Sequence, residues 1–286
     1  MDTKNANYKY YSLITAKHNL LSLNLREVWK YRDLIWLFTK RTFALTYKQT
    51  ILGPAWVFLT PLISSLIYAF VFGGIAGIGT DGIPQILFYL SGNAVWTLFS
   101  SCVTKNATTF TANANVFGKV YFPRLTVPIS NVLASIIQFG VQMILVFVFM
   151  IFYVIRGDVH PVWWAWILIP LVLVHLGIMG LGVGIIISSL TTKYRDLSIL
   201  VTFGVQLWMY ITPIVYPLST LSDGWMKFIL LLNPVTAPVE VFRYALLGAG
   251  SIIPEFLIYS WIFTIMVALI GIIIFNKVEK TFMDTV

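Results

Sequence analysis

Residues 125–155 read LTVPISNVLASIIQFGVQMILVFVFMIFYVI, a long run that contains no charged side chain. A helix needs about 20 consecutive apolar residues to cross the hydrocarbon core of a bilayer. This stretch is longer than that requirement, and no glycine-rich or charged break interrupts it. The run therefore predicts a transmembrane helix and makes lipid the solvent of the fold.

The rest of the chain has the same character on both sides of this run. Of its 286 residues, 58% are hydrophobic and only 10% are charged, whereas soluble domains carry about 25% charged residues. The mean hydropathy is +0.85. Five further apolar segments predict an all-α integral membrane protein with six transmembrane helices, the others being residues 54–74, 85–106, 162–190, 197–216 and 254–275.

Two polar segments and one amphipathic segment border the six-helix transmembrane domain, which we place at residues 53–276. Residues 1–33 are polar and basic, and residues 277–286 form a short tail. Residues 34–52 alternate aromatic side chains with Lys40 and Arg41, which predicts an amphipathic helix in the membrane interface with its basic side toward anionic headgroups. The alternative is a helix packed on a soluble partner. Leu52-Gly53-Pro54 ends this segment.

The charges predict the orientation. Of the 19 Lys and Arg residues, all but Arg156, Lys227 and Arg243 fall on the side of the two termini. The positive-inside rule places that side in the cytoplasm, so the expected location is the inner membrane with both termini cytoplasmic. Because topology accounts for the net charge of +8, no nucleic-acid partner is needed.

The sequence has none of the motifs that would supply chemistry or energy. It contains no G-x-x-x-x-G-K-[ST] loop and no H-E-x-x-H or Cys/His cluster, so we expect no ATP site, cofactor, metal or catalytic residue in this chain. The spans carry almost no carboxylates, which speaks against an ion-coupled pump. His175 lies mid-span, either as a functional group or as a neutral histidine bonded to a neighbour.

Several local patterns occur together in a fixed order along the six spans. They are Leu52-Gly53-Pro54-x-Trp56, Asn115-x-x-x-Lys119-Val120-Tyr121-Phe122-Pro123-Arg124, Lys193-Tyr194-Arg195-Asp196, Thr212-Pro213-Ile214-Val215-Tyr216-Pro217, Asn233-Pro234 and Glu240-x-x-Arg243. In this order they resemble the permease subunit of ABC exporters for polysaccharides, most of all the O-antigen exporters. The resemblance covers roughly residues 30–275.

The resemblance implies a transport complex. Such a permease pairs with a second copy of itself and with two copies of a separate P-loop ATPase, which binds ATP and Mg. The complex moves a lipid-linked polysaccharide from cytoplasm to periplasm. Alternatives are an ABC permease for another substrate (teichoic acid, capsule, drug), a membrane-embedded enzyme acting on lipid-linked sugars, and a channel. The spans lack the polar rings that ion selectivity requires.

The loop at residues 107–124 is the expected contact with the ATPase. Its segment 111–124 mixes apolar and polar residues and ends at a proline, which suits a coupling helix that docks in a partner groove. The alternative is that it folds back on the membrane surface. The residues assigned to coupling are Asn115, Phe117, Lys119, Tyr121, Phe122, Pro123 and Arg124.

Two places are candidate gates. Arg195 and Asp196 precede the fifth span, where they form either a gating salt bridge or simple helix-start chemistry. Residues 217–252 are apolar pieces broken by Pro and Gly, which predicts re-entrant helices at the outer face with Asn233 and Pro234 at the turn. The alternative is an amphipathic loop that rests on the surface.

Aromatic side chains are frequent on the first and fifth spans. Their faces can stack on sugar rings of many kinds, so a channel lined with them would let a polymer slide; the alternative is packing against lipid. The candidate channel-lining residues are Trp56, Phe58, Tyr68, Phe70, Phe203, Trp208, Tyr210 and Tyr216. Gly180 and Gly184 form a G-x-x-x-G close-packing face, either within a subunit or between subunits.

Overall fold

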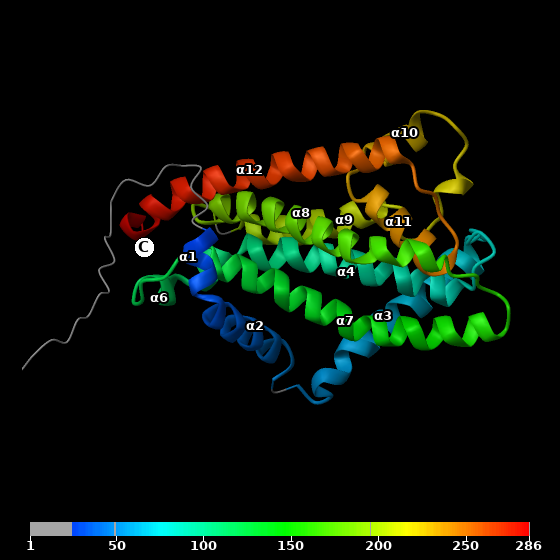
Figure 1. Cartoon of the computed structure of the whole chain (residues 1–286), viewed down its shortest axis with the longest axis horizontal. Helices are drawn as coiled ribbons and strands as arrows, with labels where there is room; N and C mark the ends of the chain where they lie inside the picture. Colours follow the sequence, from blue (N-terminus) through cyan, green and yellow to red (C-terminus); the bar gives the residue numbers. More distant parts are fainter. Residues whose placement is uncertain (1–24, 49, 195, 286) are drawn as a thin grey trace, which may run out of the picture.

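The computed structural model describes residues 25–48, 50–194 and 196–285, and within these ranges the ordered elements are all helices (Figure 1). The predicted all-α membrane fold is therefore confirmed. The elements are α1 (Leu25–Lys30), α2 (Arg32–Tyr47), η1 (Gly53–Ala55), α3 (Trp56–Tyr68), η2 (Ala69–Ile75), α4 (Gln85–Ala107), α5 (Thr109–Ala112), α6 (Ala114–Phe117), α7 (Thr126–Ile155), η3 (Trp163–Ile167), α8 (Leu168–Thr191), α9 (Leu197–Tyr210), η4 (Leu218–Thr220), α10 (Trp225–Leu232), α11 (Thr236–Leu247) and α12 (Pro254–Thr285).

Four long helices, α12, α8, α4 and α7, lie side by side as the body of the bundle (Figure 1). The central helix α4 packs against α3, α7, α8, α9 and α11. Glycines allow its close approach to α8: a Cβ on Gly180 would lie 2.5 Å from the Cβ of Cys102, and one on Gly184 would lie 2.5 Å from the Cβ of Asn106. The G-x-x-x-G face is thus used within the subunit, against α4.

Most predicted spans coincide with long helices. Five segments are long and apolar enough to cross a membrane: Gly53–Ile75, Gln85–Ala107, Thr126–Ile155, Trp163–Thr191 and Pro254–Val278. A sixth crossing is reached if the pair α10 and α11, bent by 89°, counts as one span.

The predicted fifth span, 197–216, is helical only as far as Tyr210, and turns follow. At about 1.5 Å per residue, its 14-residue helix is shorter than the roughly 30 Å hydrocarbon core. Pro213 explains the early end, because proline lacks an amide hydrogen and disfavours helical geometry in the residue before it.

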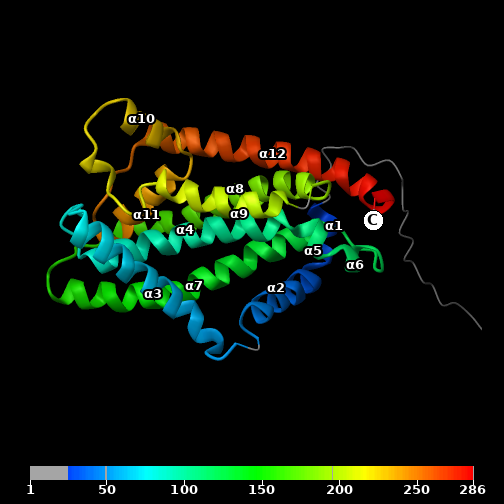
Figure 2. The same cartoon turned by 180° about the vertical axis from the view of Figure 1, so that it is seen from behind.

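The two ends of the bundle differ. One end, called here the α2 end, carries α1, α2, the α5–α6 loop and the C-terminal part of α12; the opposite end, the α11 end, carries α10 and α11 (Figures 1 and 2). The helix predicted at residues 34–52 is shorter: α2 begins at Arg32, ends at Tyr47 before an extended Lys48, and packs along α7. Ile35, Phe38 and Thr39 face inward, while Trp36, Leu37 and Leu45 are exposed.

Candidate functional site

The C-terminal end of α9 is followed by backbone carbonyls that accept no hydrogen bond within a helix. After Tyr210 the chain unwinds through residues 211–216, which leaves carbonyl groups of Ile211, Pro213 and Ile214 without helical partners. Inside a membrane protein such groups need internal donors, because no lipid can supply them. Two side chains from the following helices provide these donors.

Asn233, at the turn between α10 and α11, is the first. Its Nδ2 donates to the carbonyl of Ile211 at 3.2 Å and to Oγ1 of Thr212 at 2.8 Å. Its Oδ1 accepts from Nε1 of Trp208 at 3.0 Å and from the amide of Val235 at 3.1 Å. Both amide hydrogens and both acceptor positions are used, so one buried side chain connects α9 to the turn between α10 and α11, called here the bend.

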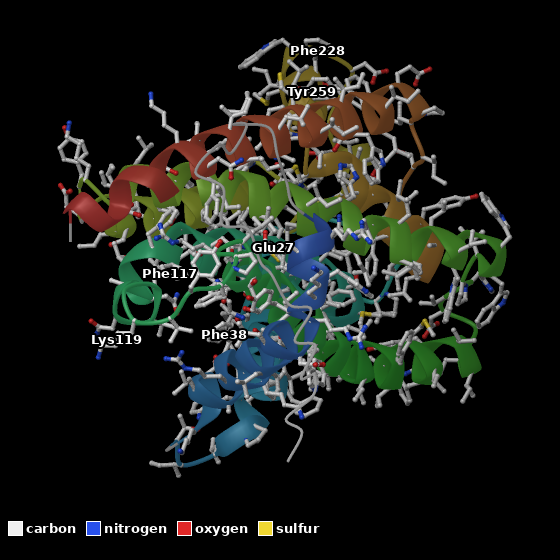
Figure 3. The ribbon with its side chains drawn as sticks, turned by 60° about the vertical axis from the view of Figure 1, so that its left-hand side comes forward. Glu27, Phe38, Phe117, Lys119, Phe228 and Tyr259 are labelled. Carbon is white, nitrogen blue, oxygen red and sulfur yellow. The ribbon has the colours of Figure 1, made fainter. Side chains whose placement is uncertain are left out.

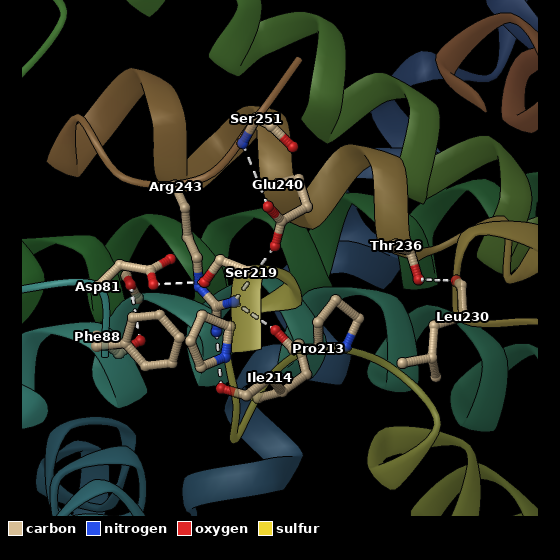
Figure 4. Close-up of polar contacts among 12 residues, drawn as sticks. Asp81, Phe88, Pro213, Ile214, Ser219, Leu230, Thr236, Glu240, Arg243 and Ser251 are labelled. Carbon is tan, nitrogen blue, oxygen red and sulfur yellow. Dashed lines mark hydrogen bonds and ion pairs between the residues drawn. The ribbon is translucent and has the colours of Figure 1, made fainter. Parts of the chain in front are cut away.

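Arg243 on α11 is the second. Its guanidinium, fully buried, donates to the carbonyl of Pro213 and, at 2.7 Å, to that of Ile214 (Figure 4). It lies 3.9 Å from the ring centroid of Phe88, and Glu240 is 3.7 Å away as counter-ion. The planar fork of arginine suits two neighbouring acceptors better than lysine would. Arg243 therefore holds the unwound segment against α4.

α11 enters the bundle and does not rest on its surface. Most of its residues are buried, and it packs on α4, α8 and α12, whereas α10 buries none of its residues. Gly248 ends α11 with φ +72°, where a Cβ would lie 2.4 Å from the carbonyl oxygen of His160. Residues 217–252 thus form a buried helix, α11, and a helix on the surface, α10, and the bent pair has the form of either a broken span or a re-entrant loop.

His175 connects the bend to the long helices. Its Nε2 lies 2.9 Å from Oγ1 of Thr264 and 3.0 Å from Oγ of Ser260, and Ser260 donates to the carbonyl of Pro234. Its ring stacks on Trp261 with centroids 4.2 Å apart. The polar partners are thus hydroxyl groups of α12, and the histidine joins α8 to α12 beside the bend.

The loop at 107–124 is not the single coupling helix that was predicted. It forms two one-turn helices, α5 and α6, followed by irregular chain. Asn113 separates them, donating from Nδ2 to the carbonyl of Thr109 at 3.0 Å. Gly118 and Pro123 then prevent extension, because glycine costs helix stability and proline removes a donor.

Two residues assigned to ATPase contact are buried instead. Phe117 and Phe122 belong to a group of rings, the aromatic cluster, that also contains Phe38 of α2, Phe110 of α5 and Phe275 of α12. Centroid distances within it run from 4.9 Å to 6.1 Å, and Arg124 lies 5.8 Å from the centroid of Phe117. The cluster ties the loop to the bundle.

The other residues of the loop face outward or lie partly covered. Figure 3 shows Phe117 directed into the structure and Lys119 directed away from it. Asn115 and Lys119 are exposed, and Pro123 is half-buried. Val120 and Tyr121 are 59% and 67% exposed, so the outward face of the loop is apolar at its tip. Direct contact with a partner is thus open to Lys119, Val120 and Tyr121.

The structure divides the channel-lining candidates into two groups. Tyr68, Trp208 and Tyr216 are half-buried: Tyr68 donates to Sδ of Met209 at 3.7 Å, Trp208 packs edge-on to Phe99, and Tyr216 donates to the carbonyl of Tyr210. Phe58 is also half-buried. The exposed group is Trp56, Phe70, Phe203 and Tyr210. The exposed rings alone can meet a polymer or a second subunit.

The gate candidates before α9 are only partly described. Arg195 lies outside the described residues. Asp196 occupies the N-cap position of α9, is exposed, and makes no side-chain capping hydrogen bond. The sequence predicts a turn at Asn233 but not the bonds that its side chain makes with α9 and the segment after it, because those three partners lie more than twenty residues away in the chain.

The sequence matches known transporters over most of its length. Residues 33–247, from the start of α2 to the end of α11, match the family model described as ABC-2 type transporter. Two Klebsiella pneumoniae proteins, each named O-antigen export system permease protein RfbA, are 30% and 28% identical over 253 residues, 88% of this chain and 94% of theirs. A Myxococcus xanthus protein of the same name is 28% identical over 222 residues, 77% of this chain and 82% of its own.

Proposed function

The chain belongs to the ABC-2 type transporter family, and on that premise we propose that it is the transmembrane subunit of an exporter for a lipid-linked, O-antigen-like polysaccharide. The observation that carries the proposal is the match to proteins named for O-antigen export along nearly their whole length. The multi-pass helical fold is what a permease requires. Teichoic acid, capsule and drug transport lack a comparable observation.

The energy would come from a partner. The full sequence holds no P-loop, so ATP and Mg would be bound by two copies of a separate ATPase, and two copies of this chain would form the pathway. The basic residues favour an orientation in which the α2 end faces the cytoplasm and the α11 end faces the periplasm of an inner membrane.

Force from the ATPase would enter through the loop at 107–124. Lys119, Val120 and Tyr121 present the outward face, and the buried Phe117 and Phe122 connect it to helices α2 and α12 through the aromatic cluster. Tightly packed rings transmit a displacement because interiors have low compressibility. In this role Phe117 and Phe122 position the loop and do not touch the ATPase.

The polymer would pass along the exposed aromatic faces of α3 and α9. Both helices pack on α4, as does η2, which continues α3. Phe203 and Tyr210 project from α9 and Phe70 projects from η2. Ring faces hold sugars through many weak apolar contacts, which permits sliding. At the α11 end, Asn233 and Arg243 would fix the unwound end of α9 as the outer gate.

The first test is purification of the full chain from membranes, followed by an ATPase assay. We expect a P-loop subunit in equal number, with activity that responds to lipid-linked polysaccharide. Tyr121→Ala should weaken ATPase association at least about fivefold, as loss of a contact worth about 1 kcal/mol does. Phe228→Ala, a similarly exposed ring at the α11 end, is the matched control. A chain that purifies with no ATPase would contradict the proposal.

A further inference from the structure

A cavity of about 370 Å³ lies between α2 and the rest of the bundle, at the α2 end. Its walls come from α2, the end of α4, the α5–α6 loop and the start of α7. The volume is within the range of ligand sites, about 300 to 1,000 Å³. The aromatic cluster contributes only Phe38, so the cavity is a separate feature from the coupling contacts.

The cavity is positively charged. Arg41 of α2 and Lys105 of α4 both line it, and no Asp or Glu does. Lys105 is half-buried, and its Nζ donates only to neutral groups, Oγ of Ser135 and Oε1 of Gln138, each at 3.3 Å. Among the described residues neither cation belongs to an ion pair. Lys105 lies near the end of the candidate span Gln85–Ala107, where an ionisable residue is a functional candidate by default, and Arg41 is exposed at the mouth of the same cavity.

The other polar groups of the cavity suit an anion that carries oxygen atoms. Thr42 and Asn113 line it beside the two cations, and the Thr42 hydroxyl and the second amide hydrogen of Asn113, whose first goes to the carbonyl of Thr109, can donate to phosphate oxygens. Asn131 also lines the cavity, but its Nδ2 already donates to the carbonyl of Lys105 and to Oδ1 of Asn106. Arginine is well matched to phosphate because its guanidinium donates two parallel hydrogen bonds, and lysine binds phosphate as a point charge. The lining therefore fits a phosphate better than a neutral or cationic group.

The position of the cavity indicates that the phosphate belongs to a lipid. α2 exposes Trp36, Leu37 and Leu45, the pattern of a helix whose outer side meets the acyl–headgroup boundary. A second cavity of about 420 Å³, between α4 and α9, shares Thr108 with the first and is lined by the hydroxyls of Thr104, Ser198 and Thr202. A molecule whose phosphate lies between Arg41 and Lys105 at this boundary is a lipid with its hydrocarbon chain in the bilayer.

We propose that Arg41 and Lys105 form a binding site for the phosphate of a membrane lipid. The source is either an anionic phospholipid or the phosphate that anchors a lipid-linked polysaccharide. The phosphate site is inferred from the cavity alone. That its phosphate comes from a lipid-linked polysaccharide rests, in addition, on the proposed function.

The test is a binding titration of the full-length chain in phosphatidylcholine nanodiscs, followed by native mass spectrometry. The probes are phosphatidylglycerol and a polyprenyl diphosphate. Because one basic residue near a membrane surface contributes about 1 kcal/mol, Arg41→Gln and Lys105→Gln should each weaken binding about fivefold. Lys105→Arg, which keeps the charge, should bind more tightly than Lys105→Gln.

Lys40→Gln is the matched control, because Lys40 is the neighbour of Arg41 on α2 but lies over the ring of Trp36 and does not line the cavity. Equal weakening by Lys40→Gln, or none by Arg41→Gln and Lys105→Gln, would overturn the proposal. Tighter binding of the diphosphate assigns the site to the transported lipid, and equal or tighter binding of phosphatidylglycerol assigns it to a bilayer lipid. ATPase copurification, measured separately, tests the proposed function alone.

Discussion

Asn233→Ala tests whether one side chain holds the unwound end of α9 against the turn between α10 and α11. The substitution removes four hydrogen bonds, two to the unwound end of α9, one from Trp208 and one from the amide of Val235. Hydrogen bonds between membrane helices contribute on average about 0.6 kcal/mol each. The four together give a loss of local stability of about 2 to 3 kcal/mol. We expect this loss at the turn between α10 and α11 and at the end of α9, while α4 and α8 stay packed.

A loss of that size raises the local opening equilibrium about 30- to 150-fold, since each 1.4 kcal/mol is about tenfold. Hydrogen exchange by mass spectrometry measures this opening directly. We expect faster exchange in peptides covering 208–216 and 230–240, and unchanged exchange in 85–107. Asn115→Ala, at an exposed asparagine of the α5–α6 loop, is the matched control. An increase below threefold at the bend, or an equal increase in α4, would refute the reasoning.

Two further substitutions test the contacts of α4, one with α8 near the α2 end and one with the unwound segment after α9. Gly184→Ala places a Cβ 2.5 Å from that of Asn106 and 2.8 Å from the carbonyl oxygen of Val103. We therefore expect the free energy of unfolding to fall by about 1 to 3 kcal/mol and the melting temperature to fall with it. Gly204→Ala, whose Cβ would have no atom within 4 Å, should leave the melting temperature unchanged or raise it, and equal melting temperatures of the two variants would contradict the close contact. Arg243→Lys should lose one of the two hydrogen bonds to carbonyl groups, which costs about 1.5 to 3 kcal/mol for a charged donor. Hydrogen exchange in residues 211–216 should therefore become faster. Exchange at the wild-type rate there would show that the two-pronged guanidinium is not needed.

The comparison of sequence and structure is instructive at the loop of residues 107–124. The mixture of apolar and polar residues indicated a partner-facing helix, and that pattern does not separate residues that face a partner from residues that face the protein's own helices. Phe117 and Phe122 turned out to be covered by α2 and α12, which lie about 80 and 150 residues away in the chain. Tyr121, between them in sequence, is exposed.

The sequence alone determined the all-helical membrane fold, the positions of most spans and the break at Asn233-Pro234. These follow from local chemistry, because a chain in lipid must satisfy its backbone within each helix and because proline interrupts that pattern wherever it stands. Family membership was visible for the same reason, in motifs that are short and local.

Only the tertiary structure decided how the irregular segments are held. The carbonyls freed after Tyr210 are taken by Asn233 and Arg243, and Lys105 of α4 meets Arg41 of α2 across a cavity. These residues come from segments that are far apart in sequence, and their arrangement depends on how closely α4 approaches its neighbours. No periodicity within one segment encodes that distance, because it is set by side chains on both partners at once.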